Sequence, residues 1–180
     1  MGQARERLLN AAEARLLATG PSGLVLDAVA GDAGISKGGL LYHFPSKQAL
    51  VEGLCQRMLD HLDRELASLS AADPEEAGAW TRAYLTSTVT EEGKPANNSA
   101  QLMAGVLACL GRDSSLLEEV RARFARWHRR LESDGIDPTT ATLVRLAADG
   151  LWLSALLGLP RLDAQSGADA IRALRELTRP

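Results

Sequence analysis

Apolar residues recur every three or four positions along most of the chain, the spacing that gives an α-helix one apolar face. The clearest case is a run of five apolar residues at intervals of four: Leu50, Leu54, Met58, Leu62 and Leu66. Leu and Ala supply most apolar positions and favour helix over sheet. No segment predicts a strand convincingly, so we expect an all-α protein. The predicted helices span residues 5–19, 27–33, 36–43, 46–69, 74–90, 98–110, 114–132, 138–158 and 167–178.

Glycines, prolines and capping residues separate these helices. Gly34 suits the left-handed conformation that closes a helix, and Ser36 is a good N-cap for the next one. The two short helices on either side of this turn, 27–33 and 36–43, predict a helix-turn-helix. Three further helix starts are predicted. Ser46 is a capping residue, and in Asp73-Pro74 and Asp137-Pro138 a capping aspartate is followed by a proline suited to the first helical position.

The segment ISKGGLLYHFPSK, residues 35–47, places two adjacent glycines beside the densest aromatic cluster of the chain. A glycine costs a helix interior about 1 kcal/mol relative to alanine, which is tolerable where the backbone must approach another surface closely. The second helix of a helix-turn-helix lies in the major groove of DNA with its N-terminal part nearest the bases. Gly38 and Gly39 fall there. Tyr42 and His43 follow one turn later, where they can reach phosphates or thymine methyls.

This region resembles the DNA-binding domain of the TetR (tetracycline repressor) family of bacterial regulators. Three stretches carry the resemblance in matching order and spacing: RLLNAA, AVAGDAGISKG and LYHFPSKQAL. The resemblance implies an N-terminal three-helix DNA-binding domain with a helix-turn-helix at residues 1–48 and a helical effector-binding and dimerisation domain at 49–180, joined by the long helix at about 46–69. The expected DNA contacts are Ser36, Lys37, Gly38, Gly39, Leu40, Tyr42, His43 and Lys47.

Three residues depart from the family pattern: Leu41 in the second helix of the motif, and Val25 and Asp27 at the first helix, from which fewer DNA contacts are therefore expected. Leu41 stands where a second tyrosine is common, and Val25 where a threonine often caps that helix. Asp27 stands where a basic residue is common, and an acid there would repel DNA unless it is paired. Because the glycines carry no side chains, we expect Lys37 and Tyr42 to supply most base readout and DNA shape to supply the rest.

Lys47 opens the long helix, where a cation opposes the helix dipole unless a phosphate docks beside it. The alternative interpretation of this segment is a helical hairpin with a solvated lysine.

The helix predicted at 138–158 is apolar around much of its circumference, which implies burial on two sides. The family resemblance implies a two-fold dimer built from this helix and the one at 167–178. An interior helix of a monomer is the alternative. A dimer with recognition helices about 34–36 Å apart would match a palindromic operator, and a ligand could change that spacing through the long 46–69 helix.

Aromatic and apolar side chains of the second domain could line a pocket for a small-molecule effector. The candidates are Trp80, Tyr84, Met103, Leu107, Phe124, Trp127, His128 and Trp152. Residues with helical spacing more often belong simply to the core, so only some of these eight residues are expected to contact a ligand. Five arginines between 121 and 130 spread around their helix, which favours a solvated face over an anion site.

Charge and cysteine usage add less. The net charge is −3, with +1 in residues 1–50 and −4 in the remainder, a mild asymmetry that decides nothing by itself. No secretory signal is visible, and the longest apolar stretch, 150–159, is far shorter than the ~20 residues that span a bilayer. Cys55 and Cys109 show no metal or disulfide spacing, so we expect a reduced, cytoplasmic protein with no membrane partner.

Catalytic and metal-binding patterns are not found. His61 and Glu65 form the one near-ligand pair, and a closed zinc site needs four ligands. No phosphate-binding glycine loop or nucleophile-elbow motif occurs. We therefore expect no enzyme activity, no cofactor and no metal. The sequence favours a ligand-responsive transcriptional regulator, more often a repressor in this family; the alternative is a helical dimeric interaction protein without specific DNA binding.

Overall fold

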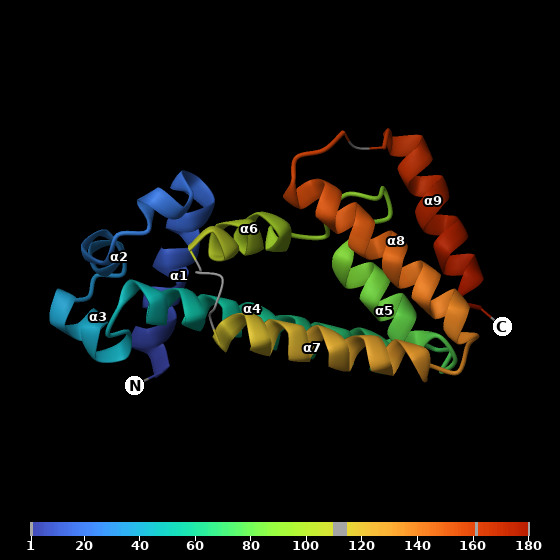
Figure 1. The fold of residues 1–180 in the computed structure, drawn as a ribbon, viewed down its shortest axis with the longest axis horizontal. Coiled ribbons are helices and arrows are strands. Elements are labelled where there is room, and N and C mark those ends of the chain that lie inside the picture. The colour runs from blue at the N-terminus through green and yellow to red at the C-terminus, as the bar shows by residue number, and fades with distance from the viewer. Residues whose placement is uncertain (1, 110–114, 161, 180) are drawn as a thin grey trace. The chain divides into compact units, whose positions relative to one another are not determined.

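The structure, a computed structural model, describes residues 2–109, 115–160 and 162–179, and this part of the chain is helical with no strand (Figure 1). The helices are α1 (Gly2–Thr19), α2 (Leu26–Asp32), α3 (Lys37–His43), α4 (Lys47–Ala72), α5 (Ala79–Thr88), α6 (Ser99–Cys109), α7 (Ser115–Glu132), α8 (Pro138–Leu156) and α9 (Ala164–Leu177). The predicted all-α class is confirmed. No helix among the described residues is long and apolar enough to cross a membrane.

The first compact unit comprises residues 1–58 and 101–117. In it α1 contacts both α2 and α3. Each of the three helices contributes a fully buried side chain to a shared core, for example Leu9, Val29 and Leu40. These contacts confirm a three-helix arrangement around the helix-turn-helix. A closely packed α6 completes the unit, since a Cβ added at Gly105 would lie 2.7 Å from Cγ of Leu16.

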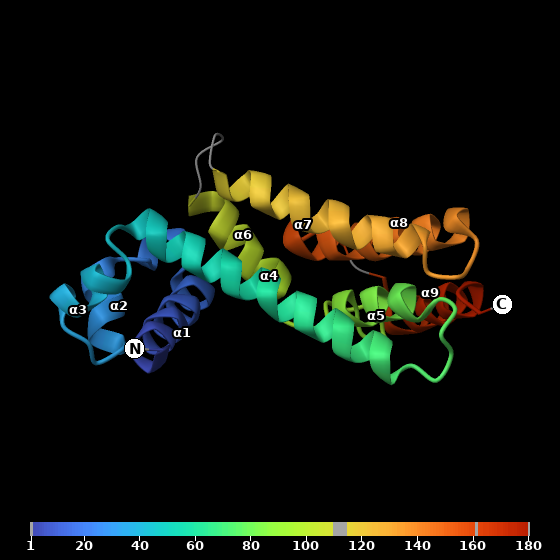
Figure 2. The ribbon, with the colours of Figure 1, turned by 90° about the horizontal axis from the view of Figure 1, so that it is seen from below.

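The second compact unit comprises residues 59–100 and 118–180. Here α8 packs against both α5 and α9 (Figure 1, Figure 2). One side of α8 carries the small buried residues Ala141, Val144 and Ala148, which permit close approach of α5. The C-terminal part of α4 and the adjoining α7 add large buried side chains such as Leu66 and Trp127.

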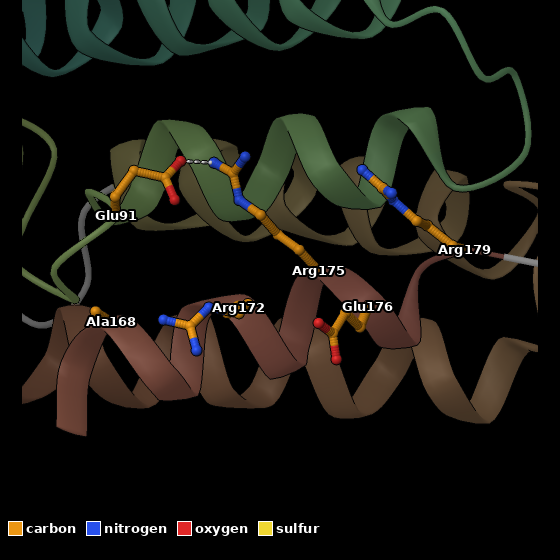
Figure 3. A pocket seen from close by; sticks show the side chains of 6 residues that line it. All are labelled: Glu91, Ala168, Arg172, Arg175, Glu176 and Arg179. Carbon is orange, nitrogen blue, oxygen red and sulfur yellow. Dashed lines mark ion pairs between the residues drawn. The ribbon is translucent and has the colours of Figure 1, made fainter. Parts of the chain in front are cut away.

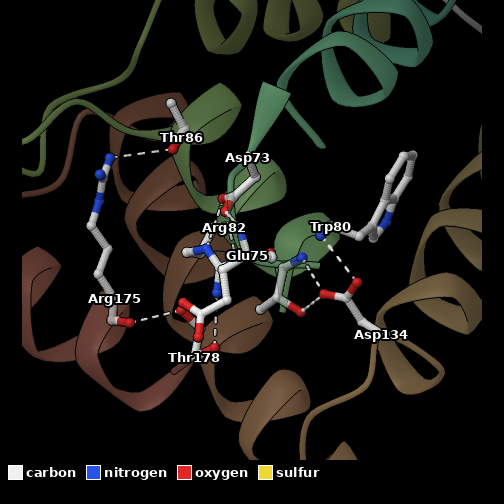
Figure 4. Close-up of polar contacts among 9 residues, drawn as sticks. Asp73, Glu75, Trp80, Arg82, Thr86, Asp134, Arg175 and Thr178 are labelled. Carbon is white, nitrogen blue, oxygen red and sulfur yellow. Dashed lines mark hydrogen bonds and ion pairs between the residues drawn. The ribbon is translucent and has the colours of Figure 1, made fainter. Parts of the chain in front are cut away.

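The helix predicted from Asp73-Pro74 to residue 90 is wrong at its start. α5 begins at Ala79, after Gly78 in the left-handed conformation with φ 77°. Asp73 accepts hydrogen bonds from Nε and Nη2 of Arg82 at 2.8 and 2.9 Å (Figure 4). The segment before α5 is therefore held by contacts with the helix that follows it. The other helix boundaries lie within three residues of the prediction.

The two compact units do not correspond to a single cut of the chain, because residues 101–117 belong with residues 1–58. The division predicted from sequence was 1–48 and 49–180. Compactness alone does not show where a DNA-binding domain ends, so that boundary stays a prediction.

Candidate nucleic-acid interface and ligand-binding region

The turn between α2 and α3 is built as the sequence predicts. Gly34 has φ 61°, and its N–H donates to the carbonyl oxygen of Gly31 at 3.0 Å. The N–H of Ile35 donates to Ala30 O at 2.9 Å. Arg7 reaches across from α1 and donates to the carbonyl oxygen of Ala33. The turn is thus fixed both by its own backbone and by a side chain of α1.

α3 has a buried side and an exposed side. Ser36 caps it by accepting a hydrogen bond from the N–H of Gly39 at 3.1 Å, and Leu40 is fully buried. On the other side Tyr42 is 74% exposed and its ring meets that of His43 edge-on, with centroids 5.2 Å apart. Lys37 is exposed at the start of the same helix. The side chain of Leu40 therefore belongs to the core and is not among the proposed DNA contacts.

The adjacent glycines of α3 have different surroundings. A Cβ added at Gly39 would lie 2.8 Å from Cγ2 of Ile35, so this glycine is required by packing inside the unit. A Cβ added at Gly38 would meet nothing within 4 Å. The fold therefore explains Gly39, whereas Gly38 has an open, exposed surface over it.

Both lysines of the predicted interface have partners within the chain. Nζ of Lys37 lies 2.9 and 3.1 Å from the two carboxylate oxygens of Asp27. Nζ of Lys47 donates to the carbonyl oxygen of Pro21 at 3.1 Å. Val25 occupies the N-cap position of α2 without a side-chain hydrogen bond and is 52% exposed. Asp27, the acid that departs from the family pattern, is thus paired with Lys37, the lysine that we expect to read bases.

The eight candidate effector residues do not all lie in one unit. Met103 and Leu107 belong to α6 within the first compact unit. The second compact unit holds the remaining six: Trp80, Tyr84, Phe124, Trp127, His128 and Trp152.

Within the second unit, Tyr84, Phe124 and His128 gather around a polar contact. The hydroxyl of Tyr84 donates to Oδ1 of Asp149 at 2.6 Å. Burial first, and then the negative charge of Asp149, raise the pKa of Tyr84, so its hydroxyl stays protonated. The ring of His128 lies edge-on to both aromatic rings, with centroids 6.3 Å from Tyr84 and 6.0 Å from Phe124.

His128 has a buried Nε2 atom that makes no hydrogen bond. Partial burial, followed by the positive charge of Arg145, lowers the pKa of His128, while Asp149 and Glu132 act in the opposite direction. The imidazole is therefore neutral near pH 7, and its Nε2 can donate or accept one hydrogen bond. A ligand or a water could provide that partner.

The tryptophans among the candidates have structural partners. Nε1 of Trp127 donates to Oδ1 of Asp63 at 2.6 Å, and Arg123 and Arg126 bind the same carboxylate. Burial alone would raise the pKa of Asp63, but the hydrogen bonds from Trp127 and Arg126 and the two guanidinium charges outweigh it and lower that pKa. This cluster ties α4 to α7.

Trp80 packs beneath the guanidinium of Arg130, whose Cζ lies 3.9 Å from the ring centroid. The indole N–H of Trp152 approaches Oγ of Ser99 at 3.4 Å.

A shallow surface pocket lies beside α9 and is lined by Glu91, Ala168, Arg172, Arg175, Glu176 and Arg179 (Figure 3). None of the eight candidate effector residues lines it. Arg175 is paired with Glu91 at 2.5 Å and also donates to Oγ1 of Thr86 at 3.2 Å. The lining mixes guanidinium and carboxylate groups, which is typical of a solvated surface.

Sequence reasoning missed the three acids that organise the second unit: Asp63, Asp134 and Asp149. Each binds a partner more than 50 residues away along the chain, and no local spacing marks that contact. No cluster of three or more metal-ligating side chains occurs within residues 2–109, 115–160 and 162–179. His61 and Glu65 lie 3.8 Å apart as a single pair.

Two parts of the chain match models of known protein families. Residues 8–54 match the family model described as bacterial regulatory proteins of the tetR family, and residues 78–179 match that of the tetracyclin repressor-like C-terminal domain. A transcriptional regulator from Streptomyces coelicolor A3(2) has 21% identity and a TM-score of 0.71, covering 99% of both chains. A transcriptional regulator from Rhodococcus sp. Rha1 has the same identity and TM-score, covering 97% of this chain and 95% of that one.

The multidrug binding protein EbrR, in complex with malachite green, is also similar in structure. Its identity is 24% and its TM-score 0.63, and the match covers 98% of both chains. The two family models together span the helix-turn-helix and the helices from α5 to α9. The chain belongs to the TetR family of transcriptional regulators, which are DNA-binding transcription factors and not enzymes.

Proposed function

We propose that this protein is a repressor that binds a palindromic operator as a homodimer and is released by a small-molecule effector. The observation that carries the proposal is the division of α3: Leu40 anchors it in the core while Lys37, Gly38 and Tyr42 are exposed on one capped helix. A recognition helix needs this arrangement, since one side must be held firmly while the other enters the major groove. The proposed place of action is the cytoplasm, where a bacterial operator lies.

The proposed contacts divide by chemistry. Lys37 and Tyr42 read base edges, because an ammonium donates to guanine O6 or N7 and a phenol ring can contact a thymine methyl. Ser36, His43 and Lys47 contact phosphates and fix the position of the helix. Gly38, with nothing within 4 Å of an added Cβ, lets the backbone approach the duplex, and Gly39 maintains the turn beneath it.

Homodimerisation is supported by an exposed apolar stripe on α8 and its C-cap residue, Leu157. Its members are spaced three or four residues apart and are exposed: Leu143, Leu146, Gly150, Leu153 and Leu157. A stripe of this spacing is typical of a helix that packs against another helix. Gly150 at its centre has nothing within 4 Å of an added Cβ, which would allow a second helix to come close. Leu177 adds a further exposed leucine on α9.

An effector site in the second unit is supported by the unpaired Nε2 of His128 beside Tyr84 and Phe124. A buried polar atom without a partner is costly unless something binds to it. EbrR, which has the same fold, binds malachite green and ethidium. Aromatic dyes are therefore the first compounds to screen against this protein.

The test is selection of binding sites from random duplex DNA with the purified protein, followed by a salt titration on the enriched sequence. An enriched inverted repeat with salt-dependent affinity is expected, and the effector screen then uses this operator. A well-folded dimer that enriches no sequence at any salt concentration would contradict the proposal.

One observation favours the alternative, a helical dimeric interaction protein without specific DNA binding. Every Lys and Arg in the described part of the first unit has a partner within the chain. Lys47→Glu separates the two hypotheses. A repressor loses operator affinity and keeps its dimer, whereas the DNA profile of an interaction protein does not change.

A further inference from the structure

The ion pair between α2 and α3 suggests a specific task for an acid on the DNA-facing side. We propose that Asp27 is a specificity-determining residue, which acts through Lys37 to suppress binding to non-operator DNA. The inference rests on the proposed operator contact by Lys37. It assigns to Asp27 a role opposite in sign to that of the basic residue common at its position.

The geometry of the pair makes it a chemical unit. The ammonium of Lys37 lies within 3.1 Å of both carboxylate oxygens of Asp27. Both side chains are 64% exposed, so the pair does not serve the core. Exposed pairs of this kind contribute little to stability. Both charged groups are therefore accessible to a ligand that binds at α3.

An ammonium has three N–H donors, and two carboxylate oxygens leave at least one donor direction open. A base acceptor such as guanine O6 or N7 is a neutral group, so a paired Lys37 can donate to it without bringing Asp27 against a full negative charge. A phosphate is itself an anion. To bind a phosphate, Lys37 must either break its ion pair and leave the Asp27 carboxylate unpaired near the DNA backbone, or bring that carboxylate close to the phosphate, which is also negative. Both outcomes are unfavourable.

The surrounding charges strengthen this effect. Arg7 and Arg15 are already engaged, with the carbonyl of Ala33 and the carboxylate of Asp32 respectively. Neither is free to neutralise Asp27 if Lys37 turns away. Sequence-independent affinity comes from neutralised phosphates, so a lysine directed away from phosphates lowers that affinity selectively. The consequence is a larger ratio of operator affinity to non-operator affinity.

Asp27→Asn in the full-length dimer tests the inference, with affinities measured for the selected operator and for a scrambled duplex of equal length. We expect affinity for the scrambled duplex to rise about fivefold or more and operator affinity to change by less than about threefold. The salt dependence of scrambled-duplex binding should steepen by about 0.9 for each protomer that gains a phosphate contact. Asp27→Glu keeps the charge and should keep most of the wild-type specificity ratio.

Asp32→Asn is the matched control. It makes the same change in net charge on the same helix, but its partner is Arg15, which is not an expected base contact. Its specificity ratio should stay near that of the wild type. In a Lys37→Ala background, Asp27→Asn should no longer change the ratio, because the residue through which Asp27 acts is gone.

Any of the following results would overturn the inference. Asp27→Asn could raise both affinities by the same factor, could change the specificity ratio no more than Asp32→Asn does, or could keep its effect without Lys37; in each case Asp27 would not set specificity through Lys37. A wild-type protein that selects no operator would overturn the proposed function as well. A wild-type protein that selects an operator, with a specificity ratio unaffected by Asp27→Asn, would overturn this inference alone. Thermal unfolding of each variant confirms that the compared proteins are folded.

Discussion

Gly38 shows how a single residue can be placed for a surface outside the chain. Its φ is not positive, and an added Cβ meets nothing within 4 Å. Alanine is the better helix former, so Gly38→Ala should stabilise the fold by up to about 1 kcal/mol. We expect the melting temperature to rise while operator affinity falls, since the added methyl would separate the backbone from the duplex. Unchanged operator affinity would show that the glycine serves no close approach. Gly39→Ala, which clashes with Ile35, should instead destabilise the protein.

His128 predicts a pH dependence of stability. Partial burial and then Arg145 lower the pKa of this imidazole below its ordinary value of 6.5, so the unfolded chain binds the proton more readily than the folded one. Its contribution is complete above pH 6.5 and is lost as the pH falls through 6.5 toward the folded pKa. We expect the wild type to lose more free energy of unfolding between pH 8 and pH 5 than His128→Gln does. Parallel losses in urea titrations would contradict this assignment.

At the scale of elements, α5 depends on a cap supplied from far along the chain. Asp134 accepts hydrogen bonds from the N–H groups of Trp80 and Thr81 at 3.0 and 2.7 Å, and from Oγ1 of Thr81 at 2.8 Å (Figure 4). Losing a helix cap costs ~1 kcal/mol, and bonds to a charged acceptor are stronger. Asp134→Ala should lower the free energy of unfolding by about 2 kcal/mol in urea titrations. Asp169→Ala, on the exposed surface of α9, should change it by less than about 0.5 kcal/mol.

The same element shows which features the sequence could predict. Ser36, Gly34 and Asp137 act within four residues of themselves, so their roles as caps and turn were predicted and are confirmed. Asp134 acts on a helix more than 50 residues earlier, so no local pattern in the sequence identifies it as the cap of that helix. α5 was consequently predicted to start at Asp73-Pro74, because a local signal was present and the distant one was invisible.

The candidate sites divide in the same way. The exposed side of α3 follows from a short motif with a fixed spacing, so its residues could be named in advance. Tyr84 and His128 could be named as aromatic candidates, but the hydrogen bond from Tyr84 to Asp149 and the ring contact between Tyr84 and His128 join three helices and depend on packing. Met103 and Leu107 fit the apolar pattern equally well and fall in the other compact unit. Apolar spacing identifies a helix face without identifying what it faces.

The exposed stripe on α8 predicts the effect of a charge at the proposed dimer interface. Leu153 is 48% exposed near the middle of the stripe, and a glutamate there would be buried without a partner in a dimer. We expect Leu153→Glu to be monomeric in sedimentation or light scattering at concentrations where the wild type is a dimer. Ala125→Glu, on the exposed side of α7, introduces the same side chain away from the stripe and should remain dimeric. Two dimeric variants would place the interface elsewhere.

At the scale of the whole molecule, operator binding by a dimer doubles the contribution of every phosphate contact. Lys47 is the proposed phosphate-binding cation. To bind a phosphate it must give up its hydrogen bond to the carbonyl oxygen of Pro21, which is a neutral acceptor. Lys37, by contrast, is held by a carboxylate. Lys47 should therefore dominate the salt dependence, whereas Lys37 should dominate the choice of sequence.

Lys47→Gln removes one phosphate contact from each protomer. The slope of the logarithm of affinity against the logarithm of salt concentration should become shallower by about 2 for the dimer, since each neutralised phosphate contributes about 0.9. The loss should be nearly equal for operator and scrambled duplexes, because a phosphate contact carries no sequence information. Filter binding or fluorescence anisotropy at four or more salt concentrations measures both quantities. A loss confined to the operator, with the slope unchanged, would move Lys47 from the phosphates to the bases and require a different position of α3 in the groove.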